Sequence, residues 1–290
     1  MKTIIITDSS CDIPKDFLEE NNIPVIPFHF YLKGKDYEDD FGKTISYEDF
    51  YHELRNGEMA TTAQITPYTY ENYFKKYVDE GYSIIYIGLS SALSESYNHS
   101  IMAKNTILSE NPEADITVID SKSASIGQGL LVREANKMLK DGKSKEDIVD
   151  WLEKNKLKVN HWFTVDSLDH LRRGGRLSAT SAIVGTMLNV KPILIVDNDG
   201  KLVPAQKVRG RKKAIRVLME ELKDRGINIE EQTIYIVHGD CIEDAEYLKN
   251  MIMEELNVKD VIINCLGPVI GTHTGPGLLA IVFIGQNREL

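Results

Sequence analysis

The sequence contains few cysteines, and those that it has are far apart. Cys11, Cys241 and Cys265 form no Cys-x-x-Cys pair, so the sequence supports neither a disulfide framework nor a structural zinc site. Long apolar runs are also missing, and the longest fall far below the roughly 20 residues that span a bilayer. The apolar stretch near the N-terminus is too short for a signal peptide. We therefore predict reduced thiols, no metal, no integral membrane association and a cytoplasmic protein.

Basic residues are outnumbered by acidic ones. Lys and Arg total 34 against 44 Asp and Glu, which gives a net charge of −10. Binding to nucleic acid or to an anionic membrane surface needs a basic face, so this balance argues against both. Hydrophobic residues make up 42% of the chain, enough to fill a sizeable core and too many for an intrinsically disordered protein.

The common catalytic and nucleotide-binding motifs are absent as well. The sequence has no G-x-S-x-G elbow, no P-loop, no G-x-G-x-x-G fingerprint and no zincin spacing. We predict a protein without catalytic residues and without a cofactor. One catalytic alternative stays open, in which Ser94 and His273 act as nucleophile and base.

Short apolar runs alternate with amphipathic stretches in the first half of the chain. The runs predict β-strands at Thr3–Thr7, Val25–Phe30, Ser83–Leu89 and Ile116–Ile119. Helices are expected at about 66–80, from Ser90-Ser91 to about 109, and at about 125–139. This alternation is typical of parallel strands joined by crossover helices, an α/β domain.

The pattern becomes less regular after about residue 150. Strands are predicted at Val159–Val165, Pro192–Val196, Leu202–Val208, Thr233–His238, Val261–Cys265 and Leu279–Ile284. Helices are predicted at Ser144–Lys154, before Arg173, and at Ser178–Leu188, Lys212–Arg225 and Glu243–Leu256. Asp199-Gly200 marks a hairpin turn, which indicates a mixed sheet.

We expect two closely packed α/β domains, 1–157 with a mainly parallel sheet and 158–290 with a mixed sheet. No Gly/Ser-rich or Pro-rich linker separates them. A cleft between two such domains is a natural ligand site.

Two polar loops of the first half follow or precede predicted elements. Thr7–Asp12 offers short hydroxyl donors and carboxylates, and either rims a site or simply caps the following helix. Thr62 and Gln64 precede the helix that starts at Thr66-Pro67, and capping by Thr66 leaves both unexplained.

A third loop, Ser90–Tyr97, is rich in serine. Helix capping accounts for one serine but not for the full set, which includes Ser91 and Ser94. A helix N-terminus also offers free backbone N–H groups to a carboxylate or phosphate.

The fourth segment, Gly271–Gly277, contains glycines and a proline that are expected to form a loop holding His273 in a defined place. A histidine there can donate a directional hydrogen bond to an anionic group, and contributes a charge if protonated. Five other histidines are expected to be inert: His29, His52, His99, His161 and His170. Two loop arginines beside glycines, Arg176 and Arg209, are candidates for a phosphate or partner contact.

The ordered set of motifs resembles the DegV family across essentially the whole chain. The motifs are Thr7-Asp8-Ser9, Thr62-Ala63-Gln64, Ser90–Ser94 with Tyr97, Val118–Ser121, Leu171–Arg176, Lys207-Val208-Arg209 and His273–Gly277. The resemblance implies two α/β domains with a lipid tunnel between them and one bound long-chain fatty acid, such as palmitate. It further implies that Thr62 and Ser94 hold the carboxylate near His273.

Some family members serve as the acyl-carrying subunit of a bacterial fatty acid kinase. The resemblance therefore implies a role in lipid transport or fatty acid metabolism, with a fatty acid kinase subunit as partner and Arg209 facing that partner or an acyl phosphate. Two segments differ from the usual family pattern: Glu95-Ser96 replaces Gly-Thr, and Ala63 replaces Ser in a segment that ends in Ile65 rather than Pro. Glu95 is compatible with a carboxylate site only if its side chain faces solvent.

Two alternatives to a fatty-acid carrier remain. One is an acyl hydrolase that uses Ser94 and His273. The other is a binding protein for a phosphorylated small molecule, held at the helix start at Ser90–Ser94 with Arg176 or Arg209 as the counter-ion.

Overall fold

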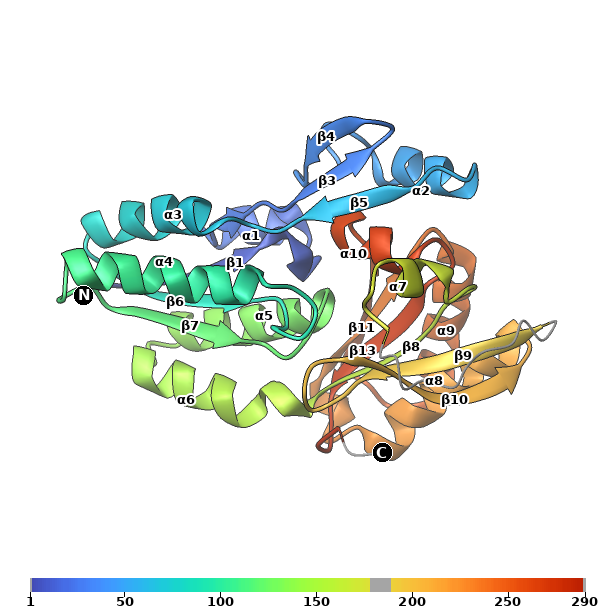
Figure 1. Cartoon of the computed structure of the whole chain (residues 1–290). Helices are drawn as coiled ribbons and strands as arrows, with labels where there is room; N and C mark the ends of the chain where they lie inside the picture. Colours follow the sequence, from blue (N-terminus) through green and yellow to red (C-terminus); the bar gives the residue numbers. More distant parts are fainter. Residues whose placement is uncertain (1, 178–188, 289–290) are drawn as a thin grey trace.

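A computed structural model describes residues 2–177 and 189–288 of the chain. The described residues form two lobes that lie side by side, with the N-terminal half in one and the C-terminal half in the other (Figure 1). A small sheet from the N-terminal half extends over the C-terminal lobe. The predicted helix Ser178–Leu188 lies outside the described residues.

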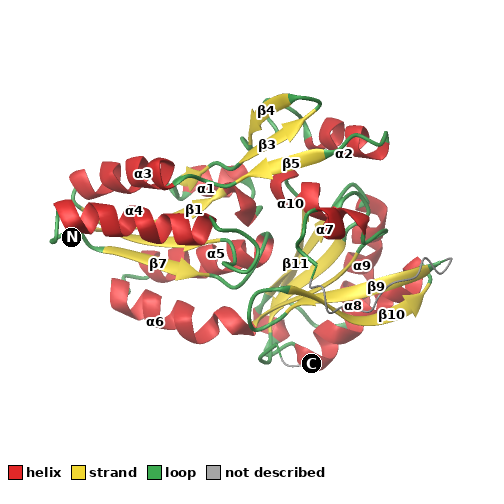
Figure 2. Cartoon of the chain, in the orientation of Figure 1, coloured by secondary structure: helices red, strands yellow, loops and turns green. Residues whose placement is uncertain are grey.

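The N-terminal lobe is built on a parallel sheet, sheet A, with strand order β2-β1-β6-β7. Its strands are β1 (Lys2–Asp8), β2 (Val25–Ile26), β6 (Tyr82–Gly88) and β7 (Ile116–Asp120). The flanking helices are α3 (Pro67–Asp79), α4 (Ser96–Glu110), α5 (Ile126–Lys140) and α6 (Lys145–Asn155). Figure 2 shows α3 and α4 on one face of the sheet and α5 and α6 on the other. Because both faces are covered, β6 is a nearly continuous buried run rather than an alternating one.

The C-terminal lobe is built on a mixed six-stranded sheet, sheet C, with strand order β10-β9-β8-β13-β11-β12. Its strands are β8 (Val159–Thr164), β9 (Val190–Val196), β10 (Leu202–Arg209), β11 (Thr233–His238), β12 (Asp260–Cys265) and β13 (Leu279–Ile284). Helices α8 (Arg211–Arg225) and α9 (Ile242–Glu255) cover one face. Strands β11 and β12 pair in parallel, and the other neighbouring strands of this sheet pair antiparallel. Strands β9 and β10 form the predicted hairpin, in whose turn Gly200 has a φ of 83°. The two predicted sheet types, mainly parallel and mixed, are confirmed.

A third sheet, sheet B, was not predicted from the sequence. It is antiparallel with order β4-β3-β5, and its strands are β3 (His29–Leu32), β4 (Lys35–Glu38) and β5 (Ala60–Ala63). The predicted strand Val25–Phe30 is wrong, because the chain leaves sheet A around Pro27 and re-enters pairing in sheet B. Proline has no N–H for a ladder, which explains the break. Lys33 and Gly34 both have positive φ, so they form the tight turn that a two-residue hairpin needs.

The remaining helices connect the lobes or complete them. They are α1 (Lys15–Glu20), α2 (Tyr47–Arg55), α7 (Asp169–Arg173), α10 (Pro268–Thr274) and the short turns η1 (Ser9–Cys11), η2 (Lys156–Lys158) and η3 (Ile229–Glu231). Helix α10 belongs to the C-terminal half but contacts β3, β5, α2 and η1 of the N-terminal half. Within the described ranges, no helix combines the length and the apolar character needed to cross a membrane.

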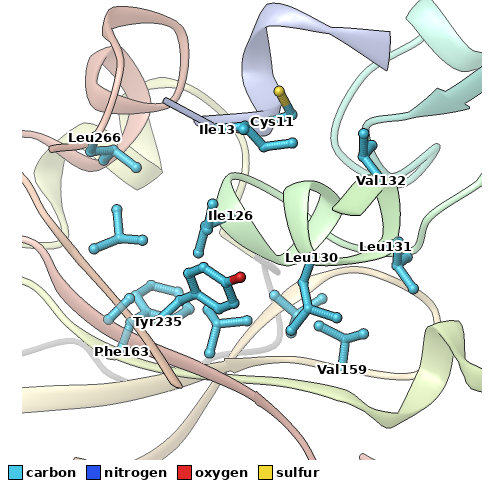
Figure 3. Packing of buried hydrophobic residues seen from close by; sticks show 14 of the residues in the cluster. Cys11, Ile13, Ile126, Leu130, Leu131, Val132, Val159, Phe163, Tyr235 and Leu266 are labelled. Carbon is cyan, nitrogen blue, oxygen red and sulfur yellow. The ribbon is translucent and has the colours of Figure 1, made fainter. Parts of the chain in front are cut away.

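One hydrophobic cluster runs through both lobes, as the prediction of close packing requires. Figure 3 shows Cys11, Ile126 and Leu130 from the N-terminal half beside Phe163 and Leu266 from the C-terminal half. Every strand of sheets A and B precedes residue 121, and every strand of sheet C follows residue 158. The exact boundary near residue 157 stays a prediction.

Arg288, close to the end of the chain, also joins the lobes. Its side chain is 5% exposed and donates to backbone and hydroxyl acceptors rather than to a carboxylate. The acceptors are the carbonyl oxygens of Lys122, Lys156, Val159 and Asp197 and the hydroxyl of Ser123, at 2.5–3.2 Å. Burial lowers the pKa of Arg288 to about 9, so the guanidinium is still charged at neutral pH.

Candidate functional site

A mostly apolar pocket lies between the two lobes, where the prediction placed a ligand site. It contains about 980 Å³ of space not filled by atoms, part of it open to solvent. Its apolar lining comes from both halves of the chain: Phe28, Ala63, Leu89, Leu93, Ala124, Phe163, Val196, Leu202, Val237, Leu266, Val269, Ile270, Leu278, Ala280 and Val282. Its polar lining consists of Thr62, Gln64, Ser94, Ser125, His161, Arg176, His273 and Thr274.

One wall of the pocket is a face of sheet C. Ala280 of β13 lies between Phe163 of β8 and Val237 of β11 in the strand register, and all three side chains line the pocket. Residues one position along, such as Ile281 and Ile236, point the other way into the core beneath α8 and α9. Both faces of the sheet are therefore apolar, one for the core and one for the pocket.

Thr62 and His273, two polar residues of the pocket lining, contact each other. Thr62 lies on β5 and His273 on α10, and their Oγ1 and Nε2 atoms are 2.8 Å apart. The contact joins the two halves of the chain. Both residues were predicted as ligand-binding residues from separate loops.

His273 lies on a helix, so the predicted glycine-rich loop is wrong for the first part of the segment. Pro268 occupies the first turn of α10, and Gly275, with φ 73°, follows its last residue. Proline near a helix start and glycine past its end are the usual signals, and they were present in the sequence. The glycines therefore end a helix that carries the imidazole, rather than forming a loop around it.

The imidazole of His273 is neutral near pH 7. Burial lowers its pKa to about 4, and the nearby charge of Arg176 acts in the same direction. Its Nδ1 is buried against Gly174 and has no hydrogen-bond partner among the described residues. An unpaired N–H is less tolerable in a buried place than an unpaired lone pair, so we infer that the proton is on Nε2. Nε2 then donates to Thr62, which leaves the hydroxyl hydrogen of Thr62 free for a ligand.

Ser94 and Arg176 line the same part of the pocket. Arg176 is half-buried and its Nε donates to the carbonyl oxygen of Leu93, 3.1 Å away. Ser94 Oγ donates to Ser96 Oγ and accepts from the Ser96 amide, so it caps the start of α4. Thr62, Ser94, Arg176 and His273 thus contribute three neutral polar groups and one cation to the lining of a mostly apolar pocket.

The predicted helix start at Ser90-Ser91 is wrong, because α4 begins at Ser96. The backbone amides before it already have acceptors. The Ser90 amide donates to Ser123 O, the Ser91 amide to Asp120 Oδ1, and the Ser94 amide to Ser90 O. These amides are therefore not available to a phosphate.

Three other predicted residues take different places. Ser91 lies outside the lining, and its hydroxyl accepts from Lys122 Nζ. Gln64 lines the pocket but is largely exposed, which puts it at the rim. Arg209 is exposed at the end of β10, outside the lining. Glu95 is exposed and accepts from Asn98 Nδ2, so its carboxylate faces solvent as a carboxylate site requires.

Two histidines expected to be inert lie near the site. His161 lines the pocket from β8, and its ring packs so closely on α5 that a Cβ at Gly127 would be 1.8 Å from Nε2. His170 of α7 packs against Gly275 at the end of α10. Burial lowers the pKa of both, so neither is expected to be charged at neutral pH. Only the alternation of β8 could have shown that His161 points into the pocket.

The Thr7–Asp12 loop is buried and does not line the pocket. Asp8 accepts hydrogen bonds from Ser10, Tyr86 and Gln128, and these hold the ends of β1 and β6 to α5. Within the described residues, no group of three or more His, Cys, Asp or Glu side chains is placed to hold a metal ion.

Asp39, beside this loop, makes stability depend on pH. Burial and the neighbouring charge of Asp12 raise the pKa of Asp39 to about 8. As the pH rises from about 4 to 8, the unfolded chain loses this proton while the native protein keeps it, so the free energy of unfolding falls. Asparagine has no proton to lose over this pH range, so the free energy of unfolding of Asp39→Asn should not fall in this way. We expect the variant to be more stable than the wild type by on the order of 3 kcal/mol at pH 8, with little difference at pH 4.

Chemical denaturation at pH 4.5, 6 and 8 measures this effect. Asp79→Asn, on the exposed end of α3, is the control and should show no such trend. A stability difference for Asp39→Asn that is the same at all three pH values would contradict the assignment.

The protein is thus a two-lobed α/β protein with a mostly apolar pocket between its lobes. The family model described as "Uncharacterised protein, DegV family COG1307" matches residues 2–286. A DegV domain-containing protein of Clostridium perfringens is 45% identical over 288 residues, with 99% of each chain covered. The chain belongs to the DegV family.

Solved structures of the family have the same fold. The DegV family protein of Thermus thermophilus, described as fatty acid binding, has a TM-score of 0.89 and 27% identity, with 98% of this chain and 100% of that one covered. DegV of Bacillus subtilis, described as a fatty acid binding protein, has a TM-score of 0.83 and 31% identity, with 99% and 100% covered. A protein of Eubacterium ventriosum described as binding stearic acid has a TM-score of 0.83 and 26% identity, with 98% of each chain covered.

Proposed function

We propose that this protein binds one long-chain fatty acid in the pocket between its lobes, with the acyl chain on the apolar wall and the carboxylate at Thr62, Ser94 and His273. The observation that carries the proposal is the Thr62–His273 contact in the lining of a mostly apolar pocket. The fatty acid binding described for family members in Thermus thermophilus and Bacillus subtilis supports it.

The acyl chain supplies most of the binding free energy in this arrangement. Each buried methylene contributes about 0.8 kcal/mol, so a palmitoyl chain contributes on the order of 10 kcal/mol before ordering losses. Hydrogen bonds to the carboxylate add less, because each replaces a hydrogen bond to water. The polar groups therefore fix which end of the ligand faces the Thr62–His273 contact.

The groups at that end suit a carboxylate. Thr62 has a free hydroxyl hydrogen when His273 donates to it, and the half-buried Arg176 supplies the positive charge. An uncharged imidazole limits the local charge to that of one arginine. A monoanionic carboxylate matches this site better than a phosphate dianion.

The acyl hydrolase alternative lacks its central contact. Ser94 Oγ bonds with Ser96, and His273 Nε2 bonds with Thr62, so the two side chains do not form a nucleophile–base pair in the described structure. The phosphate alternative needs free backbone amides at Ser90–Ser94. The Ser90 and Ser91 amides already donate to Ser123 and Asp120, which does not favour this alternative. A carrier needs no activated nucleophile, and we propose no catalytic residue in this chain.

We further propose that the bound carboxylate is presented to a partner kinase that phosphorylates it, in lipid transport or fatty acid metabolism. Arg209 is the last residue of β10, and the strand register puts this end of β10 at the same end of sheet C as the last residues of β8. Helix α7 and Arg176 follow β8 in the chain. The exposed Arg209 is thus a candidate contact for the partner or for the acyl phosphate, while Arg176 borders the carboxylate itself.

The direct test measures the ligand of the full chain. Protein purified under native conditions and then denatured should release about one equivalent of fatty acid, and delipidated protein should rebind palmitate. Protein that releases no lipid and fails to bind added palmitate would refute the proposal.

Thr62→Ala and Ser94→Ala are expected to weaken palmitate binding by about three- to tenfold each, because each removes one proposed donor to the carboxylate. For Ser94, the hydroxyl hydrogen that Ser96 Oγ accepts without ligand would turn to the carboxylate. Isothermal titration of delipidated protein checks this result. The controls are Thr61→Ala, the exposed neighbour on β5, and Ser91→Ala, the serine outside the lining.

Both control variants should bind palmitate like the wild type. Ser94→Ala should also lose about 1 kcal/mol of stability, since its hydroxyl caps α4. Unchanged affinity in both test variants would remove Thr62 and Ser94 from the carboxylate site.

A further inference from the structure

Asp12 connects three separate segments of the chain at the seam between the lobes. Its side chain is buried, with 7% exposed, and its backbone is left-handed at φ 49°. Oδ1 accepts from the Gly267 amide at 2.9 Å, and Oδ2 accepts from Ser125 Oγ at 2.5 Å. Its carbonyl oxygen accepts from Asn264 Nδ2 at 3.0 Å.

One of these partners lines the pocket, and another begins a helix that lines it. Gly267 is the N-cap of α10, the helix that carries His273, and no side chain of its own caps that end. Ser125 lines the pocket directly and precedes α5. Asp12 itself does not line the pocket, so it acts on a ligand only through these groups.

The start of α10 is shaped around the Asp12 carboxylate. A Cβ at residue 267 would lie 2.6 Å from Asp12 Oδ1, which explains why glycine occupies this position. On the other side, Tyr51 of α2 donates to the carbonyl oxygen of Leu266 at 3.0 Å. The start of α10 is therefore held between η1 and α2, both from the N-terminal half.

The surroundings of Asp12 do not favour a carboxylate for stability alone. The ionisable groups that interact with it are all acids: Asp8, Cys11, Asp39, Tyr47, Tyr51 and Cys265. Burial raises the pKa of Asp12 to about 7. The hydrogen bonds that Asp12 accepts from Gly267 and Ser125 indicate a role in holding these two groups in place.

We propose that Asp12 is a positioning residue for the carboxylate end of the ligand site: by holding the start of α10 and Ser125 together, it sets the place of His273 relative to Thr62. The proposal rests on the fatty-acid function proposed above. It predicts that loss of the Asp12 carboxylate weakens binding of the ligand's carboxylate group more than binding of the ligand's acyl chain.

Asp12→Ala and Asp12→Asn separate these effects. Alanine leaves the Gly267 amide and the Ser125 hydroxyl without their acceptor. Asparagine keeps an oxygen for Gly267 and offers an N–H to the Ser125 oxygen, so it should preserve the arrangement. Asp79→Ala on the exposed end of α3 is the matched control.

The measurement compares palmitate with 1-hexadecanol, which has the same chain length and no carboxylate, on delipidated full-length protein. We expect Asp12→Ala to bind palmitate about tenfold more weakly and hexadecanol within about twofold of the wild type. Asp12→Asn should bind both within about threefold of the wild type, and Asp79→Ala should match it.

Equal weakening of both ligands by Asp12→Ala, or no weakening of either, would overturn the role of Asp12. If Asp12→Ala does not fold, Gly267→Ala decides in its place, because its Cβ pushes the start of α10 away from the carboxylate. It should lose palmitate selectively, and an unselective loss or none would overturn the role. Wild-type protein that binds neither ligand would instead refute the fatty-acid function itself.

Discussion

Replacing Ala280 with tryptophan is expected to abolish fatty acid binding while leaving the fold intact. Ala280 is 9% exposed, lies on the pocket face of β13 and has Phe163 and Val237 beside it in the sheet. An indole at this position would occupy the space above the wall of sheet C. If the acyl chain supplies on the order of 10 kcal/mol, blocking even a third of it weakens binding by more than about 100-fold.

Lipid content after native purification and palmitate titration of delipidated protein both measure this loss. Ala92→Trp, at an exposed position of the loop before α4, adds the same bulk outside the pocket and should keep its lipid. Circular dichroism and thermal unfolding show whether each variant is folded. A folded Ala280→Trp variant that still carries one equivalent of fatty acid would place the acyl chain elsewhere.

Arg288→Met is expected to reduce the free energy of unfolding by about 3 kcal/mol or more. The substitution removes the Arg288 donor from the partly buried carbonyl oxygens of Lys122 and Lys156, and it leaves the carbonyl oxygen of Val159 with the contact from His161 alone. For a chain of this size, such a loss lowers the melting temperature by about 6 °C or more. Arg288→Lys should recover part of the loss, since an ammonium group reaches some of the same acceptors but not all.

Arg216→Met on α8 is the control, because Arg216 makes an exposed ion pair with Glu255 far from the seam. Exposed pairs contribute less than about 1 kcal/mol, so this variant should melt close to the wild type. Equal melting temperatures for Arg288→Met and Arg216→Met would show that Arg288 does not hold the lobes together.

The sequence was sufficient for sheets A and C because their signals are local. Strands such as Ile116–Ile119 are short apolar runs between clear helix signals, and Asp199-Gly200 marks a hairpin by its own chemistry. Sheet B was missed because its strands are short and partly exposed, and because Val25–Phe30 reads as one run although Pro27 divides it. Which strands pair across such a break depends on contacts distant in sequence.

Five polar residues of the pocket lining followed from the residues and the family resemblance, whereas the apolar lining was not predicted. Thr62, Gln64, Ser94, Arg176 and His273 were predicted, and all line one pocket. The sequence did not show that Arg209 and Ser91 lie outside the pocket or that His161 lines it. These placements depend on the direction of side chains within strands and turns. Alternation along β8 puts His161 on the same face as Phe163, but the sequence does not show that this face borders a cavity.

The wall of the pocket is also part of the hydrophobic core: Phe163, Val237, Leu266 and Ala280 belong to both. Whatever occupies the space between the lobes thus completes the interior, much as a missing side chain would. If a fatty acid occupies this space as proposed, a hundredfold excess of it over Kd adds about 2.7 kcal/mol to the free energy of unfolding. Protein deprived of the ligand would then unfold more readily and be more sensitive to proteases.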